Sequence, residues 1–455
     1  MGGKGWAPIV LLVLSAHFAP GQDTTKVSLL FVGDVMQHDS QIRAAFDPVT
    51  NAYDYGNCFQ YIKPIVRTAD IAFANLEVTL AGPPYKGYPQ FSAPDELAAE
   101  LKRSGFDVLV TANNHSLDRG RKGLERTLDV LDTLGILHTG TFKDSASRVE
   151  AYPLVMEKNG FAISLLNYTY GTNGIPVSKP NIVNTIDTAQ IKADLTRAKE
   201  QGTDAVIVFM HWGTEYQDAP NRAQREVAEL CLENGAMLVI GSHPHVLQPM
   251  EWDKAKNTLV AYSLGNFVSG QQSRHRDGGA MLWVELEKQT AADSTSAVAI
   301  KSASYELEWV YRNNEVPKKY FVLPVKEFED DTLQVASEAA RQMLRVFVED
   351  SRKLYQKNKG VPESSRVPLE TSYYRIWLAQ SKDSIAVPGH FPVLDFYGVE
   401  VGQANDTLFC LTTGKIHDRE IAKRALEEIK STTPFTGAKI VWYYWDKRRE
   451  ETISR

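Results

Sequence analysis

The sequence is short of cysteine, of long apolar runs and of positive charge, and each shortage excludes a class of protein. Among 455 residues only Cys58, Cys231 and Cys410 are cysteines. Three widely spaced thiols cannot make a disulfide framework or a cysteine metal site, so we expect structural thiols, with Cys231 buried in a helix. The formal net charge of −6 gives no reason to expect nucleic acid as a partner, because nucleic-acid-binding domains are usually strongly basic.

The apolar run near the N-terminus is short. Residues 9–14 are apolar, Lys4 precedes them and small residues follow at 19–21, whereas a membrane-spanning helix needs about 20 apolar residues. This pattern predicts a signal peptide over residues 1–21 and an exported protein, periplasmic or associated with the cell envelope. A retained membrane anchor is the alternative. No cysteine stands near the predicted cut, which argues against a lipid-anchored thiol.

What the sequence does contain is a repeated arrangement in which an apolar run of strand length ends in polar side chains. The runs are 27–32 before Asp34, 71–74 before Asn75 and Glu77, 106–111 before Asn114 and His115, 204–210 before His211, and 237–241 before His243 and His245. In open α/β sheets, ligands bind beyond the carboxyl ends of the strands. We therefore expect the polar residues after these five runs to converge on one site.

The order of the predicted elements indicates an α/β domain followed by a smaller module. Helices predicted at 94–104, 124–134, 187–200 and 221–233 alternate with the strands, and antiparallel strands are expected at 279–286, 297–302 and 305–311. We place the main domain at 27–325 and a charged helix over 331–356 with its linker within 330–370. A small α+β module is expected at 371–447, with strands at 374–379, 397–401, 407–412 and 438–444 and a helix at 418–430.

Imidazole, carboxylate and amide oxygen together suit divalent zinc, manganese or iron, and paired ions bind oxyanions and generate a hydroxide nucleophile. Each histidine alone is more often a partly buried imidazole with a structural partner. The combination of His211 with the pair His243 and His245 predicts a site for one or two metal ions.

Two smaller features lie beside this predicted site. Residues 81–89 are rich in proline and glycine and are expected to form a flap, in which Tyr85 and Tyr88 contact a substrate or simply pack within the loop. Asp118 is expected either to cap the helix that follows or to orient His115.

Six segments, in this order, closely resemble the motifs of the CapA family, which is linked to capsule and poly-γ-glutamate synthesis. They are Val32–Val35, Phe73–Glu77, Thr111–Gly120, His211–Tyr216, Gly241–Gln248 and Tyr262–Phe267. The family resembles a branch of the calcineurin-like metallophosphoesterases. The resemblance therefore implies a four-layer α-β-β-α sandwich of the metallophosphoesterase type.

The resemblance also implies roles for single residues. Asp34 and His245 would bind a first metal, Glu77 would bridge, and Asn114, His211 and His243 would bind a second. His115, with Asp118, would stand beside the leaving group as acid or electrostatic stabiliser while a bridging hydroxide attacks phosphorus. The motifs further suggest His38, Asn75 and Glu215 as additional ligands and Trp212 and Asn266 as substrate-binding residues.

Two positions depart from the metallophosphoesterase pattern. Met36 stands where those enzymes usually carry a histidine, and Asn75 and Glu77 stand where their next motif carries aspartates. One metal would then be weakly held or absent. His38 would either replace the missing histidine or lie exposed to solvent.

The tail resembles a SPOR-like domain, a type known for binding peptidoglycan. Tyr374–Ala379 matches its opening strand and Cys410–Ala422 its strand-to-helix segment. This resemblance implies attachment to the cell wall.

Two hypotheses of different classes follow. The first is a metal-dependent hydrolase or transferase of the cell envelope, acting on a phosphoester or on the amide of an anionic γ-glutamyl polymer. The second is a non-catalytic subunit that binds or assembles an exported polymer, within a membrane synthesis complex.

Overall fold

The computed structural model describes residues 23–271, 273–291, 295–313, 318–329 and 337–365 and, towards the C-terminus, residues 373–381, 394, 399–405, 408–413, 416, 419–444 and 447–449. The predicted signal peptide lies outside these ranges. No helix within them combines the length and the apolar composition needed to cross a membrane.

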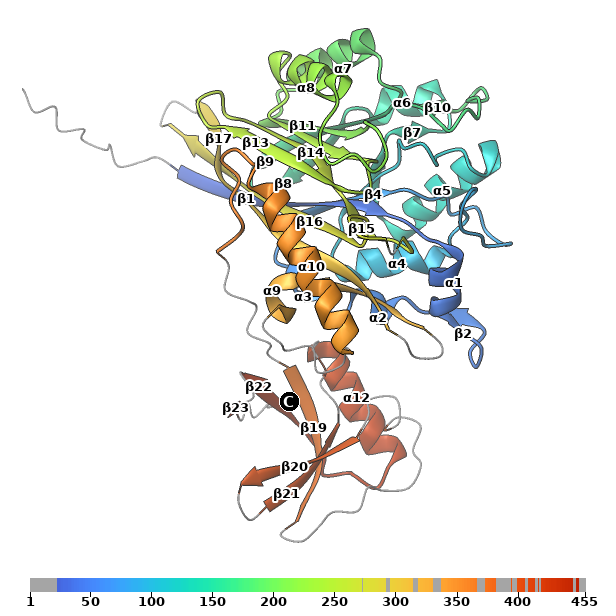
Figure 1. Cartoon of the computed structure of the whole chain (residues 1–455), viewed down its shortest axis with the longest axis vertical. Coiled ribbons are helices and arrows are strands. Elements are labelled where there is room, and N and C mark those ends of the chain that lie inside the picture. The colour runs from blue at the N-terminus through green and yellow to red at the C-terminus, as the bar shows by residue number, and fades with distance from the viewer. Residues whose placement is uncertain are drawn as a thin grey trace, which may run out of the picture.

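Eight strands form the first sheet of the main domain (Figure 1). They are β1 (Asp23–Val35), β4 (Ile71–Leu76), β5 (Val108–Val110), β6 (Leu137–Thr139), β15 (Asn266–Val268), β16 (Gly278–Thr290), β17 (Ser296–Arg312) and β18 (Tyr320–Pro324). Their order is β18-β17-β16-β1-β4-β5-β6, with β15 paired to β1. The strands β1, β4, β5 and β6 run parallel, and β16, β17 and β18 add antiparallel neighbours.

Six strands form the second sheet. They are β8 (Leu154–Lys158), β9 (Phe161–Thr169), β11 (Ala205–His211), β12 (Leu238–Ser242), β13 (Leu247–Asp253) and β14 (Thr258–Leu264). The order is β13-β14-β12-β11-β9-β8, and the four central strands are parallel. Two short ribbons pair β2 (Phe46–Asp47) with β3 (Ala52–Tyr53) and β7 (Thr141–Phe142) with β10 (Ile182–Val183).

The two sheets pack face to face because their central strands are apolar on both sides. In β1, Leu29 and Phe31 lie in the core between the sheets, whereas Leu30 and Val32 lie in the core on the outer face. β11 alternates in the same way between the shared core and the outer core of the second sheet. Strands buried on both faces are therefore continuous apolar runs, as the sequence indicated.

Helices cover both outer faces. They are α1 (Asp39–Ala45), α2 (Gly56–Phe59), α3 (Lys63–Val66), α4 (Asp95–Ser104), α5 (Gly120–Leu134), α6 (Ser145–Ala151), α7 (Thr188–Glu200), α8 (Arg222–Glu233) and α9 (Val325–Phe328). The helices α2, α3 and α4 pack on the first sheet, and α7 and α8 pack on the second. The predicted four-layer α-β-β-α sandwich is thereby confirmed.

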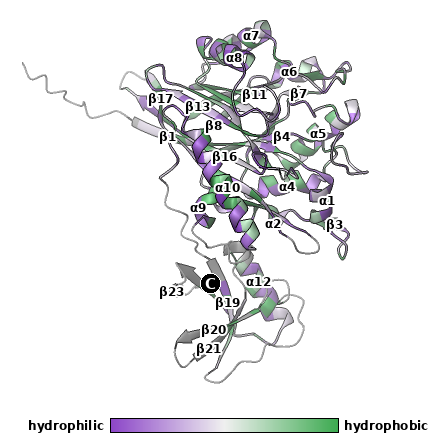
Figure 2. Cartoon of the chain, in the orientation of Figure 1, coloured by the Kyte–Doolittle hydropathy of each residue, from purple (hydrophilic) through white to green (hydrophobic). Residues whose placement is uncertain are grey.

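Helix α10 (Glu338–Tyr355) belongs to this main domain. Its apolar side, with Leu344, Phe347 and Tyr355, lies in the core shared with β13 and β17. Of the predicted helix and linker at 330–370, the described helix α10 therefore packs on the sandwich, and Lys359 forms a bridge to β13. Figure 2 shows hydrophilic and hydrophobic residues alternating along α10, as expected for a helix with one buried side.

Two predicted strands have different limits in the structure. The strands expected at 297–302 and 305–311 are one continuous strand, β17, with a bulge opposite Glu285 and Leu286. The run from Thr258 to Phe267 is instead divided at Gly265 (φ +74°), where the chain leaves β14 of the second sheet and enters β15 of the first. This crossing brings Asn266 to the edge where both sheets end.

The described residues of the C-terminal module form a five-stranded antiparallel sheet and include the helix α12. The elements are β19 (Tyr373–Ser381), β20 (Val399–Asn405), β21 (Leu408–Thr413), α12 (Arg419–Thr432), β22 (Lys439–Tyr444) and β23 (Lys447–Arg449). Ala422, Ala425 and Ile429 of α12 are buried against the sheet, with Leu426 partly buried. The structure thus contains the predicted order of strands and helix, with β23 in addition.

Candidate metal centre

The polar residues at the five strand ends converge at one edge of the sandwich. β1, β4 and β5 contribute Asp34, Glu77 and Asn114 from the first sheet, and β11 and the turn after β12 contribute the three histidines from the second. All six side chains are buried: Asp34, Glu77, Asn114, His211, His243 and His245. Residues far apart in the sequence therefore meet where the parallel strands end.

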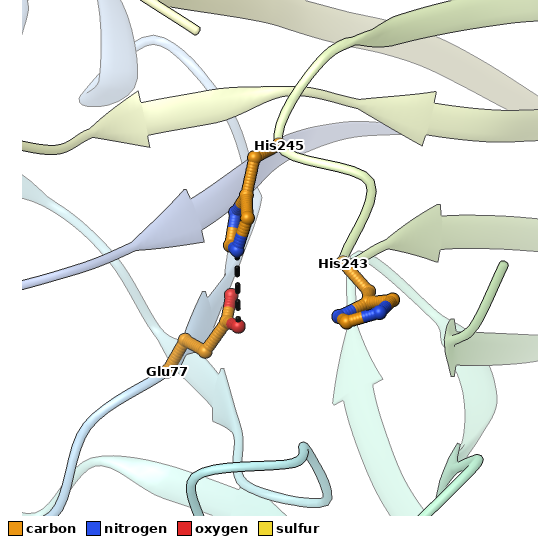
Figure 3. A group of neighbouring side chains, drawn as sticks. All are labelled: Glu77, His243 and His245. Atoms are coloured by element: carbon orange, nitrogen blue, oxygen red, sulfur yellow. Dashed lines mark ion pairs between the residues drawn. The ribbon is translucent and has the colours of Figure 1, made fainter. Parts of the chain in front are cut away.

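Glu77 lies between the histidines. One of its carboxylate oxygens, Oε1, is 3.5 Å from His211 Nε2 and 3.7 Å from His245 Nε2. The same oxygen is buried and has no hydrogen-bond partner among the described residues. In Figure 3 the ring edge of His245 faces the Glu77 carboxylate, and His243 lies beside them. Such spacing leaves room for a cation between acceptor atoms.

Two sets of three ligand atoms lie close enough for a metal ion. One set is Glu77 with His243 and His245, and the other is Glu77 with Asp34 and His211, and in each set the atoms lie within 4.8 Å of one another. Glu77 is common to both sets. A carboxylate that two sets share is placed as a bridging ligand would be.

The turn that carries His243 and His245 has an unusual backbone. The two residues have φ angles of +94° and +57°, and a residue other than glycine in the left-handed region costs about 1–3 kcal/mol. The strained turn brings the two rings to a centroid distance of 6.0 Å. Within the described part of the chain, His243 Nδ1 is buried without a partner, so it too is a candidate ligand atom.

The protonation states favour metal binding. Burial, assisted by the other imidazoles, holds the pKa of His211 well below its ordinary value and lowers the pKa of His243 to about 3. Both rings are therefore neutral near pH 7, which is the form that binds metals. Burial and the charge of Asp34 raise the pKa of Glu77 well above its ordinary value. A bound divalent cation would stabilise the ionised carboxylate of Glu77 and so lower this pKa again. The donor set therefore fits such an ion.

Asp34 is held by its neighbours. Burial alone would raise the pKa of Asp34, but the hydrogen bond and charge of His245, with the Asn75 amide, lower it. His245 Nδ1 lies 3.1 Å from Asp34 Oδ2, and Asn75 Nδ2 donates to Asp34 Oδ1 at 2.8 Å. Asn75 was proposed as an additional ligand. In the structure its amide nitrogen, rather than its oxygen, faces Asp34, and its oxygen accepts from Asn113.

His115 and Asp118 form a buried pair. His115 Nδ1 lies 2.7 Å from Asp118 Oδ2, which also accepts the Phe91 backbone N–H at 2.7 Å. The Phe91 ring packs edge-on against the imidazole at 4.6 Å. Of the two roles expected for Asp118, orientation of His115 is the one seen, because α5 begins later, at Gly120, with Arg119 as its N-cap. This pair engages Nδ1, so Nε2 is the ring nitrogen of His115 that Asp118 does not use.

The two remaining proposed ligands lie outside the cluster of ligand atoms. His38 is partly buried, and its Nδ1 accepts the Gly270 backbone N–H at 3.1 Å. Burial lowers the pKa of His38 to about 4. The metal-capable groups among the described residues do not include His38, and its side chain is only partly exposed. Glu215 is exposed at the rim, and Met36 is buried in the outer core of the first sheet.

The four proposed substrate-binding residues fall into different places. Tyr85 packs against Tyr53 at 5.1 Å, whereas Tyr88 is 69% exposed. Trp212 lies in the outer core of the second sheet, where its indole N–H donates to Tyr262 O. Asn266 is buried with its Oδ1 3.1 Å from His245 Nδ1, which makes it a support for a candidate ligand.

Sequence reasoning missed two tyrosines at the rim. The Tyr170 ring lies 4.6 Å from the His243 ring, and the Tyr216 ring lies 6.2 Å from that of His245. Tyr170 directly follows β9, so it stands at a sixth strand end beside β11. That position was the available signal, but no charged residue or histidine accompanied it.

The fold and this centre together define a class of protein. Two packed sheets between helical layers, with imidazoles and carboxylates gathered at the strand ends, define an α/β sandwich protein with a candidate metal centre. Within that class, the chain belongs to the family of bacterial capsule synthesis proteins PGA_cap, whose sequence profile matches residues 28–271.

Individual relatives agree with this family. The chain is 31% identical over 299 residues to the PGA biosynthesis protein CapA of Bacillus subtilis, which covers 62% of this chain and 76% of that protein. It is 28% identical over 287 residues to the capsule biosynthesis protein CapA of Bacillus anthracis, covering 60% and 66%. The NAD nucleotidase of Haemophilus influenzae aligns with a TM-score of 0.35 and 14% identity over 73% of this chain and 61% of that one, too slight a likeness to support an argument.

Proposed function

We propose that this protein acts in the synthesis or processing of a capsule or poly-γ-glutamate polymer as a metal-dependent hydrolase or transferase. The observation that carries the proposal is the position of Glu77, which is shared by two sets of buried ligand atoms and has an unpartnered oxygen within the described structure. Family membership and the names of the Bacillus relatives support the biological setting.

Asp34, Glu77 and Asn114, with the three histidines of the cluster, would hold one or two divalent ions. When bound, such ions polarise the substrate and lower the pKa of water. His115 Nε2 would donate a proton to the leaving group while Asp118 holds the ring through Nδ1. Asn75 would keep the Asp34 carboxylate directed at the centre through its 2.8 Å hydrogen bond.

We further propose that the protein is exported to the cell envelope and acts on an anionic polymer or a phosphoester. The short apolar run at residues 9–14 supports export. The resemblance of residues 371–447 to a SPOR-like domain supports attachment to peptidoglycan through the C-terminal module. A membrane synthesis complex would then supply or receive the polymer.

A non-catalytic role is the second candidate. Met36 stands in place of a histidine ligand and is buried away from the cluster of ligand atoms. Asn75 presents its amide nitrogen, rather than its oxygen, to Asp34. These differences favour a centre that holds the polymer without cleaving it.

Metal analysis and turnover separate the two candidates. The purified full-length protein, loaded with Mn²⁺, is tested for stoichiometric metal and for hydrolysis of an aryl phosphoester and of oligo-γ-glutamate. The enzyme proposal expects bound metal and turnover that is lost in Glu77→Gln. If the protein retains no stoichiometric metal and hydrolyses neither compound, the enzyme proposal fails and the non-catalytic binding role remains.

A further inference from the structure

The rim of the centre carries an arginine that forms no salt bridge within the described residues. Arg276 lies on the segment between β15 and β16, partly buried, and its guanidinium carbon is 4.4 Å from the centroid of the Tyr216 ring. It also donates to Ser273 Oγ. The guanidinium group is planar and stacks on aromatic faces, which leaves the donors at its edge free to bind a ligand.

Tyr216 is in turn fixed to the centre. Its backbone N–H donates to Pro244 O at 2.8 Å, in the turn between His243 and His245, and its ring lies 6.2 Å from the His245 ring. The residue has a φ of +65°, a conformation that tyrosine rarely adopts. Strained residues persist where the surrounding structure determines them, and they gather at functional sites.

The backbone of Arg276 is tied to the same histidine from the other side. Its carbonyl accepts from Asn266 Nδ2 at 2.9 Å, and Asn266 Oδ1 lies 3.1 Å from His245 Nδ1. Both the ring beneath the guanidinium and the chain that carries it are therefore positioned relative to a candidate metal ligand.

The neighbouring arginine shows the contrast. Arg274 pairs with Asp277 at 3.0 Å and with Asp350 at 2.9 Å, so its charge is used to hold the loop against α10. Arg276 has no comparable carboxylate partner in the described structure. One short segment thus supplies one arginine to the fold and another to the rim.

We propose that Arg276, stacked on Tyr216, is a subsite for a second anionic group of the substrate, next to the group that lies at the centre. This inference rests on the proposed function, because it takes the cluster to be where the substrate is held. The planar fork of arginine matches a carboxylate or a phosphate and binds either with two hydrogen bonds. The substrate class is therefore a chain with repeated anionic groups, of which one lies at the centre and the next reaches Arg276.

Equilibrium binding tests the subsite independently of turnover. A fluorescently labelled oligo-γ-glutamate is titrated with the full-length protein, in EDTA and in Mn²⁺, and its anisotropy is followed at two salt concentrations. Arg276→Gln is expected to weaken binding by about tenfold or more and to reduce its salt dependence. Arg276→Lys keeps the charge and should recover part of the loss. Arg222→Gln, on α8 with a 90% exposed side chain, is the matched control and should bind within about twofold of wild type.

Each outcome decides the question. Wild-type affinity in Arg276→Gln, with an unchanged melting temperature, overturns the subsite. Binding of polyphosphate instead of the glutamyl chain, with the same dependence on Arg276, supports the subsite and assigns it to phosphate. Failure of the wild type to bind either chain overturns it. Absence of turnover alone refutes the enzyme proposal and leaves the binding result standing.

Discussion

The side chains of Asp34 and His245 lie 3.1 Å apart, between Oδ2 and Nδ1, although 211 residues separate them in the chain. Asp34 stands at the end of β1 in the first sheet, and His245 follows β12 in the second. This contact joins the two sheets at the edge where the candidate ligands gather. Substitutions there are expected to act on ligand binding more than on the hydrophobic core, which lies between the sheets.

Glu77→Gln is expected to separate the stability of the fold from metal binding. The pKa of Glu77 is raised above 4.5 in the fold, so the carboxyl contributes most to stability below that pH and becomes unfavourable as the pH rises towards the folded value. The neutral amide removes this cost and one ligand. At neutral pH in EDTA the variant should melt at or above the wild-type temperature.

Added Mn²⁺ should raise the melting temperature of the Glu77→Gln variant only slightly. A metal present at one hundred times its Kd stabilises a protein by about 2.7 kcal/mol, and the wild type should show a shift of this order in thermal denaturation. Glu226→Gln, on the exposed side of α8, controls for the loss of a charge. Equal Mn²⁺-induced shifts in Glu77→Gln and wild type would show that Glu77 is no ligand.

His115→Ala is expected to lower turnover by about 10²- to 10⁴-fold, the range typical of a lost general acid. Metal content should not change, because His115 pairs with Asp118 and is absent from both sets of clustered ligand atoms. Turnover of an aryl phosphoester and metal analysis of the same sample provide the two measurements. An unchanged rate, or loss of metal along with the rate, contradicts this role.

Much of this centre could be predicted from the sequence because parallel strands end at a common edge. The apolar runs before Asp34, His211 and His243 fix where each strand stops, and the α-β-β-α layering then brings those stops together. Alternation within a strand also has period two. The residue after His211 therefore faces the opposite side, which is why Trp212 lies in the outer core rather than at the site.

Features that depend on distant contacts could not be predicted. The spacing of Leu344, Phe347 and Tyr355 indicates a helix with one apolar side, but it does not say which sheet that side covers. Likewise, Arg276 has nothing in its local sequence that announces a stack on Tyr216, because the turn that presents this ring lies about sixty residues earlier. Local patterns specify elements, and only the packed fold specifies such pairs.

Glu308→Gln is expected to flatten the dependence of stability on pH. Glu308 is buried, and its Oε2 accepts the Gly279 N–H at 3.0 Å while Oε1 has no partner in the described chain. Burial raises its pKa well above 4.5. As the pH rises above that value the unfolded state loses the proton and the folded state keeps it, so stability falls by about 1.4 kcal/mol per pH unit.

The Glu308→Gln variant lacks this pH-dependent loss of stability. It should therefore become more stable than the wild type as the pH rises. Urea denaturation in EDTA between pH 4.5 and 7.5 gives the difference in free energy of unfolding. The exposed Glu157→Gln on β8 serves as the control, and a constant difference across the range would exclude a raised pKa at Glu308.

Gly33→Ala is expected to destabilise the fold and to displace Asp34. A Cβ atom at Gly33 would lie 2.0 Å from the Gly265 carbonyl oxygen, the same oxygen that accepts the Asp34 N–H at 3.0 Å. The new Cβ would be attached to the backbone of β1 and would clash with the backbone at Gly265, where the chain crosses between the sheets. Neither segment can move freely. Overpacking of this kind costs about 1–3 kcal/mol or more.

Gly171→Ala is the control, because nothing lies within 4 Å of its added Cβ. Since the Asp34 carboxylate must move with its backbone, the Gly33 variant should also lose Mn²⁺-induced stabilisation in thermal denaturation. A variant that melts like Gly171→Ala and keeps its Mn²⁺ shift would contradict the close approach of β1 and β15 on which the geometry of the centre depends.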